Sequence, residues 1–169
     1  MNEIQQLSKP TSERTLMSSF FSTVLVFILT SFHHYYGAIV YQTPWRKHVV
    51  LQGGLILALC YLFYYLFNRY HKRAFLTIYL LLSFITFGLG IGIFEGAYNH
   101  VLKDILYFSG LISTDAWRVL FPSPAYEIPN DFIFESTGIL QLVLSIIQMY
   151  YLWKVVKTNY KKEEQSVVR

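Results

Sequence analysis

The fold is decided by a stretch without a single charged residue, AFLTIYLLLSFITFGLGIGIF, which occupies residues 74–94. An α-helix rises about 1.5 Å per residue, so about 20 residues cross the roughly 30 Å hydrocarbon core of a bilayer. Three further stretches have similar length and character, and the last of them carries Glu135 as its only charge. They are residues 16–36, 49–67 and 132–152. We therefore predict four transmembrane segments.

The overall composition agrees with this prediction. Of the 169 residues, 54% are hydrophobic and only 14% are charged, which is unusual for a soluble globular domain. Lipid offers the backbone no hydrogen-bond partners, and none of the four stretches shows the two-residue alternation of a barrel strand. The only cysteine, Cys60, leaves no possibility of an intrachain disulfide. The sequence thus predicts an all-α, polytopic membrane protein, a single domain over residues 1–169 whose four helices form an antiparallel bundle.

The basic residues indicate an orientation. Ten of the fourteen Lys and Arg fall on the side that holds both chain ends, and Arg46, Lys47, Lys103 and Arg118 fall on the other. Because cytoplasmic loops carry an excess of Lys and Arg, we expect residues 1–14 and 154–169 to be cytoplasmic segments of a multi-pass cell-membrane protein. The net charge of +4 is then explained by basic residues facing anionic lipid, and nucleic acid is not expected as a partner.

The connections between the helices carry recognisable signals. Thr43 and Pro44 are suited to the N-cap and the first position of the second helix, and Asn130 or Asp131 is suited to cap the fourth. The long segment 101–130 mixes apolar and charged residues. We expect it to be an external loop that contains short amphipathic helices along the membrane surface, between the third and fourth helices.

Small and polar residues recur on one face of several helices. Gly88, Gly92 and Gly96 follow one another at four-residue spacing, which favours close approach of another helix. The fourth helix repeats polar residues at three- and four-residue intervals, and such a face is not expected to look at lipid. This polar stripe comprises Asp131, Glu135, Gly138, Gln141, Ser145 and Gln148.

The ionisable members of these faces gather at the external ends of the helices. Glu95 and Glu135 each lie about one turn inside a predicted span. A charge at the bilayer centre costs roughly 2.5 to 3.5 kcal/mol and less near the interface, so both carboxyl groups should have partners. We predict Glu95, His100 and Glu135 as candidate catalytic residues. The candidate ligand-binding residues are His33, His34, Tyr41, Arg46, Asn99 and Asp131.

The first hypothesis for this cluster is a divalent metal site. His34, Glu95, His100 and Glu135 offer nitrogen and oxygen ligands that suit zinc, iron or manganese. Such a site, or the same groups acting as proton donors and acceptors, would serve an amphiphilic or lipid-linked ligand. Glu95 and His100 are five residues apart, whereas a spacing of four places two ligands on one face of an α-helix. Adjacent residues turn by about 100°, and the sequence leaves open which of His33 and His34 faces inward.

Two other hypotheses remain open. His33 or His34 and His100 would be the axial ligands of a b-type haem held between the first and third helices. Alternatively, the polar groups only form hydrogen bonds between helices, in a non-enzymatic structural or assembly subunit that contacts membrane lipids, a second copy or a membrane-complex partner. Whether the protein is an enzyme is therefore also left open.

Overall fold

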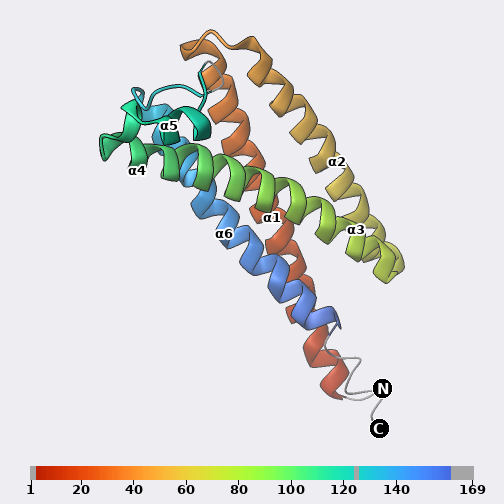
Figure 1. Ribbon diagram of the computed structural model, residues 1–169. Helices are drawn as coiled ribbons and strands as arrows, with labels where there is room; N and C mark the ends of the chain where they lie inside the picture. Colours follow the sequence, from red (N-terminus) through yellow and green to blue (C-terminus); the bar gives the residue numbers. More distant parts are fainter. Residues whose placement is uncertain (1–2, 124–125, 161–169) are drawn as a thin grey trace.

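The computed structural model describes residues 3–123 and 126–160, and within these ranges the chain is helical without a strand (Figure 1). Four of the described helical segments are long and apolar enough to cross a membrane, as the sequence predicted. They are Glu13–Val40, Pro44–Tyr70, Arg73–Phe108 and Phe132–Asn159. Residues 161–169 of the predicted cytoplasmic tail lie outside the described residues.

The elements follow one another along the chain in a simple order, with the longest helices first and last. They are α1 (Glu3–Val40), η1 (Pro44–Arg46), α2 (Lys47–Tyr70), α3 (Arg73–Ser83), η2 (Phe84–Leu102), α4 (Lys103–Phe108), η3 (Leu111–Ser113), α5 (Asp115–Leu120) and α6 (Phe132–Tyr160). Elements α3, η2 and α4 join without a break, so together they form the third span.

The connection predicted over residues 101–130 is helical at its start. The backbone of the third span continues as helix through Lys103 to Phe108. The physical reason is that the Lys103 ammonium group is buried against the Glu135 carboxylate, so this charge does not force the chain into water. The short helices η3 and α5 lie in the connection that follows, as the mixed apolar and charged pattern predicted.

Two capping predictions are resolved by hydrogen bonds. Asp131 is the residue that caps α6, because its Oδ1 accepts a hydrogen bond from the backbone N–H of Phe134 at 2.8 Å. Asn130 instead accepts a hydrogen bond from the Tyr41 hydroxyl. Thr43 precedes the 3-10 turn η1 but makes no side-chain capping hydrogen bond, so only Pro44 takes its predicted place at the start of the helix.

The glycines of η2 allow close approach to α6. A Cβ atom on Gly96 would lie 2.7 Å from the backbone nitrogen of Leu142, and one on Gly88 would lie 3.2 Å from Met149 Cγ. The prediction of tight helix packing at the glycine stripe is therefore confirmed. The helix α6 also packs along α1 for much of its length, while α2 packs against α1 and α3 (Figure 1).

A buried polar layer joins three helices in the half of the protein remote from His33, His34 and His100. Thr23 Oγ1 lies 2.7 Å from Ser83 Oγ, and Gln148 Nε2 donates to Ser83 Oγ at 2.9 Å. One turn farther along, Ser19 Oγ lies 2.9 Å from the Tyr79 hydroxyl. These contacts tie α1, α3 and α6 together by hydrogen bonds between helices, of the kind that stabilises helix packing in membranes.

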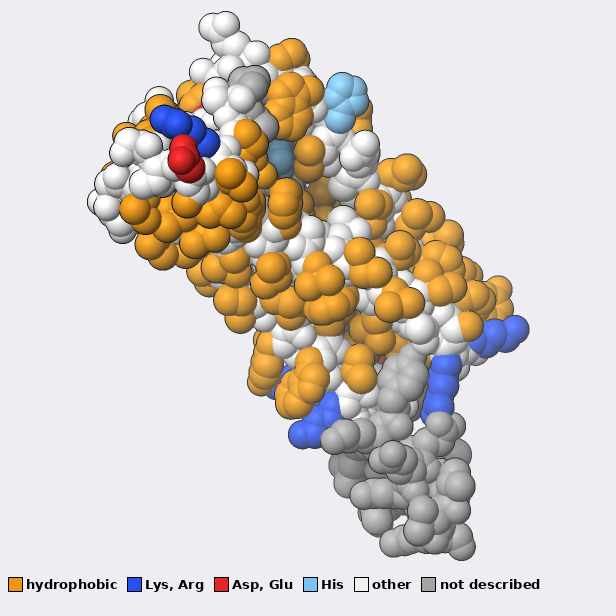
Figure 2. Space-filling view, viewed as in Figure 1, with side chains coloured by type: hydrophobic (Ala, Val, Ile, Leu, Met, Phe, Trp, Pro, Cys, Tyr) orange, Lys and Arg blue, Asp and Glu red, His pale blue; other side chains and the backbone are white. Residues whose placement is uncertain are grey.

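The outer surface is apolar over the length of the spans. Leu51 is 72% exposed, and Cys60 is the only fully buried residue that the structure describes in α2. Figure 2 shows hydrophobic side chains over the middle of the molecule and Lys and Arg side chains at its lower end. Such an extensive apolar surface is expected where lipid rather than water surrounds the protein.

Candidate metal centre

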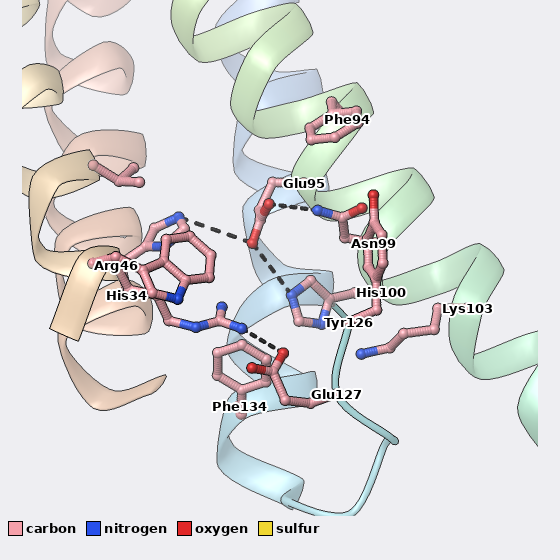
Figure 3. Close-up of a pocket in the computed structure, with 12 residues that line it drawn as sticks. His34, Arg46, Phe94, Glu95, Asn99, His100, Lys103, Tyr126, Glu127 and Phe134 are labelled. Carbon is pink, nitrogen blue, oxygen red and sulfur yellow. Dashed lines mark hydrogen bonds and ion pairs between the residues drawn. The ribbon is translucent and has the colours of Figure 1, made fainter. Parts of the chain in front are cut away.

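Both adjacent histidines of α1 are buried, at 0% exposure for His33 and 4% for His34. They point in different directions. His33 faces α6, where Nδ1 lies 2.9 Å from Thr137 Oγ1 and the imidazole stacks on the Phe134 ring with 4.2 Å between the centroids. His34 faces Glu95 across the space between α1 and η2 (Figure 3). Both histidines therefore face the interior of the protein. His33 lies against α6, and His34 lies against Glu95 of η2.

Glu95 lies at the centre of the cluster. Its Oε1 is 3.5 Å from His33 Nε2, 3.8 Å from His100 Nε2 and 3.9 Å from His34 Nε2. Its other oxygen, Oε2, accepts a hydrogen bond of 2.7 Å from Asn99 Nδ2 (Figure 3). One carboxylate oxygen is thus held by an amide, and the other faces three imidazoles.

The winding of η2 brings Glu95 and His100 together. The backbone N–H of Lys103 donates to the carbonyl of Tyr98, five residues earlier, which is the hydrogen bond of a π-helix. In this wider turn, residues five apart lie on the same face. The five-residue spacing that is unfavourable in an α-helix is therefore suited to a shared site here.

His100 joins the two predicted carboxylates through opposite ring nitrogens. Its Nδ1 lies 2.6 Å from Glu135 Oε2, while its Nε2 faces Glu95 and lies 3.2 Å from His33 Nε2. Glu135 also accepts a hydrogen bond of 3.0 Å from Lys103 Nζ. Glu135 therefore lies behind His100, and Lys103 neutralises it.

The structure groups a different ligand set from the one predicted. Ligand-capable atoms of His33, Glu95 and His100 all lie within 4.8 Å of one another. His33 takes the place we expected for His34, and Glu135 contacts the far side of a ligand instead of joining the set. Packing decides both differences, because the sequence specifies neither the rotation of α1 nor which nitrogen of His100 faces α6.

The remaining predicted ligand-binding residues surround the cluster without entering it. Arg46 forms an ion pair with Glu127 rather than with Glu135, and Tyr41 donates to Asn130 Oδ1 at 3.0 Å. Burial raises the pKa of the Tyr41 phenol, and the Glu135 carboxylate adds to the shift, so this hydroxyl remains a donor. These contacts close one rim of the site.

Two functional contacts were missed by sequence reasoning. Lys103 was assigned to the external loop, although its position three residues after His100 indicates the same helical face. Thr137 lies two residues after Glu135 and carried no signal of its own, since its role depends on the register of α6 against α1.

A cavity of about 320 Å³ opens beside Glu95. Figure 2 shows a recess in this region of the surface with a histidine side chain at its floor. Both ring nitrogens of His34 and the Oδ1 atom of Asn99 are buried without a hydrogen-bond partner among the described residues. The cavity is lined by His34, Trp45, Arg46, Val49, Phe94, Glu95, Asn99, His100, Lys103, Tyr126, Glu127 and Phe134.

The geometry argues against a haem held between His33 and His100. Axial histidines lie on opposite faces of a haem, with the iron between them. Here the Nε2 atoms of His33 and His100 are 3.2 Å apart, in direct contact, which leaves no space for a macrocycle. The same pair of nitrogens is well placed to share one small ion. No protein-family model, curated protein or solved structure matches the chain, so its function has to be inferred from the site itself.

Proposed function

We propose that this chain is a multi-pass membrane protein that binds one divalent metal ion, of the zinc, iron or manganese class, through His33, Glu95 and His100. Ligands at 2.0–2.1 Å from a tetrahedral ion are separated from one another by about 3.4 Å. The three separations here are 3.2, 3.5 and 3.8 Å. The ligand atoms therefore already stand close to the spacing that such an ion requires.

The hydrogen bonds behind the two imidazoles are the observation that carries the proposal. The Thr137 hydroxyl donates to the backbone carbonyl of Ile133 at 2.8 Å, which leaves its oxygen free to accept an N–H from His33 Nδ1. The Glu135 carboxylate accepts the N–H of His100 Nδ1. With Nδ1 protonated on both rings, the two Nε2 atoms present lone pairs to each other and to Glu95, and one divalent cation between them would satisfy all three acceptors.

The residues that surround the three proposed ligands are suited to catalysis at the metal. Glu135 orients His100 and makes its ring a stronger ligand, as carboxylates do behind metal-bound histidines. Three protein ligands leave one coordination position open, and both Glu95 and His100 line the cavity. A metal bound there supplies Lewis acidity to a water or a substrate oxygen. His34 lies 3.9 Å from Glu95 and has no hydrogen-bond partner among the residues described, so it can accept or donate a proton.

The same proposal includes an orientation and an arrangement of the helices. An antiparallel bundle in the cell membrane, with both termini cytoplasmic, places the metal centre toward the external face. The supporting observation is that Lys and Arg side chains gather at the end of the molecule opposite the cluster of His33, His34 and His100 (Figure 2). Those whose side chains the structure describes in helices near this end are Arg14, Arg69, Arg73, Lys154 and Lys157.

Metal analysis of the purified protein tests the proposal. We expect about one zinc, iron or manganese ion per chain after purification in detergent without chelators, and loss of most of it in His33→Ala, Glu95→Gln and His100→Ala. His48→Ala is the matched control, because that histidine is exposed and outside the cluster. Substoichiometric metal in the wild-type protein, even after incubation with the three ions, would contradict the proposal. A stable co-purifying subunit in its place would favour an assembly role.

A further inference from the structure

Two cavities lie in succession along the space between α2 and the third span. The first is the cavity beside Glu95, and the second has a volume of about 100 Å³. Val49 lines both, so they are neighbours. Figure 1 shows why the space exists: α2 and the third span lie close together at the α2–α3 turn and diverge toward the end that holds η1.

The two cavities differ in chemistry. The upper one, beside Glu95, contains the charged and imidazole groups of the candidate metal centre. The lower one is walled mainly by apolar side chains from α1, α2 and η2, including Phe27, Ile56, Phe87 and Ile91. Its neighbours on the outer surface are the apolar side chains that face lipid. A polar chamber followed by an apolar one matches the two ends of an amphiphile.

The charges that line the cavity beside Glu95 favour an amphiphile with an uncharged head group. The cation of Arg46 is paired with Glu127, and that of Lys103 is paired with Glu135. No Lys or Arg lining this cavity is therefore left to balance an anionic head, as far as the described residues show. The unpartnered groups are the ring nitrogens of His34 and the Oδ1 atom of Asn99. A hydroxyl group both donates and accepts, so it can satisfy an imidazole nitrogen and an amide oxygen.

We infer that this cleft binds a single-chain amphiphile with an uncharged hydroxyl head, which lies beside Glu95, His34 and Asn99 while the first part of its chain occupies the lower cavity. The inference deepens the proposed function by naming the substrate class. Binding of the amphiphile does not depend on the metal; only the reaction of its head group rests on the proposed function. The amphiphile enters sideways from the bilayer, since both cavities lie in the gap between α2 and the third span.

Native mass spectrometry of the detergent-purified protein tests the inference with matched probes. After the metal content has been measured and the metal removed with a chelator, we expect 1-tetradecanol to bind with a stoichiometry of one, and tetradecyl phosphate to bind at least tenfold more weakly. In Thr86→Phe, the added ring fills the lower cavity, which Thr86 lines, and the affinity for 1-tetradecanol falls at least tenfold. Ile85→Phe is the control, because the neighbouring side chain is 57% exposed on the outer surface and its variant should bind as the wild type does.

The metal content of the same samples separates the two proposals. Thr86→Phe should keep its metal, because Thr86 is not part of the metal cluster. Metal without selective binding of 1-tetradecanol, or preferential binding of the phosphate, would overturn the amphiphile inference alone. If the purified wild-type protein contains no metal but binds 1-tetradecanol, and Thr86→Phe abolishes that binding, the metal centre would be overturned. The amphiphile site would still be supported.

Discussion

The imidazole of His100 occupies the space that a side chain on Gly138 would fill. A Cβ atom at position 138 would overlap His100 Cγ, Cδ2 and Nδ1. This overlap involves the ring that contacts Glu135 through one nitrogen and faces His33 and Glu95 through the other. The missing side chain of Gly138 is therefore a condition for the geometry of the whole cluster.

Gly138→Ala should displace the His100 ring and remove most of the metal that we propose this site binds. Overpacking of this kind costs about 1–3 kcal/mol of stability, so the melting temperature in detergent should fall as well. Metal analysis and thermal unfolding measure the two effects. Gly90→Ala is the control, since a Cβ there meets its nearest neighbour at an ordinary 3.5 Å. Normal metal content in Gly138→Ala would show that the ring is free to move without consequence.

Lys103→Met should weaken metal binding although Lys103 is not itself a ligand. It removes the cation that neutralises Glu135, and changes behind a metal-bound histidine typically lower metal affinity 10- to 100-fold. Competition with a chelating dye measures this affinity. Arg118→Met removes an exposed cation, paired with Asp115, and should have no effect. An unchanged affinity in Lys103→Met would mean that Glu135 orients His100 without help.

Alanine at Gly96 should destabilise the protein more than alanine at Gly88. The Cβ at Gly96 meets backbone atoms of Leu142, which cannot move without shifting α6, whereas the one at Gly88 meets the flexible side chain of Met149. Melting temperatures of the two variants in one detergent provide the comparison. Equal or reversed effects would contradict the close approach of η2 to α6 at Gly96.

Arg46→Gln should loosen the segment that closes the η1 side of the cavity. Arg46, the last residue of η1, donates a hydrogen bond to the Thr43 hydroxyl and pairs with Glu127, so it ties the connection before α6 to the start of α2. Hydrogen exchange of the peptide that contains Glu127 should speed up, while exchange in α6 stays as in the wild type. The exchanged charges in the double variant Arg46→Glu/Glu127→Arg should restore part of the protection. If hydrogen exchange of this peptide is unchanged in Arg46→Gln, contacts other than those of Arg46 hold the segment over the cavity.

Gln148→Leu should lower stability and leave the metal in place. Its amide donates to Ser83 Oγ and to the Ser83 carbonyl in the remote polar layer, which contacts none of the three ligands. Hydrogen bonds between membrane helices contribute about 0.6 kcal/mol on average, so a small shift in melting temperature is expected. Loss of metal in this variant would show that the two polar layers are coupled.

Much of the site was predictable because its residues are chemically conspicuous in an apolar setting. A histidine or carboxylate within a membrane span requires a partner, so Glu95, His100 and Glu135 stand out in the sequence before any packing is known. Lys103 was missed for the opposite reason. A lysine near the predicted end of a span is usually solvated, and only its contact with Glu135 explains its burial.

The sequence alone determined the four apolar helical segments and the gathering of ionisable groups near one set of helix ends. Both follow from hydrophobicity and helix length, which are local properties of the chain. The tertiary structure decided which atoms meet. Helix rotation placed His33 rather than His34 against His100, the wide turns of η2 put Glu95 and His100 on one face, and the register of α6 set Glu135 behind His100. These depend on contacts between helices far apart in sequence, which no local pattern specifies.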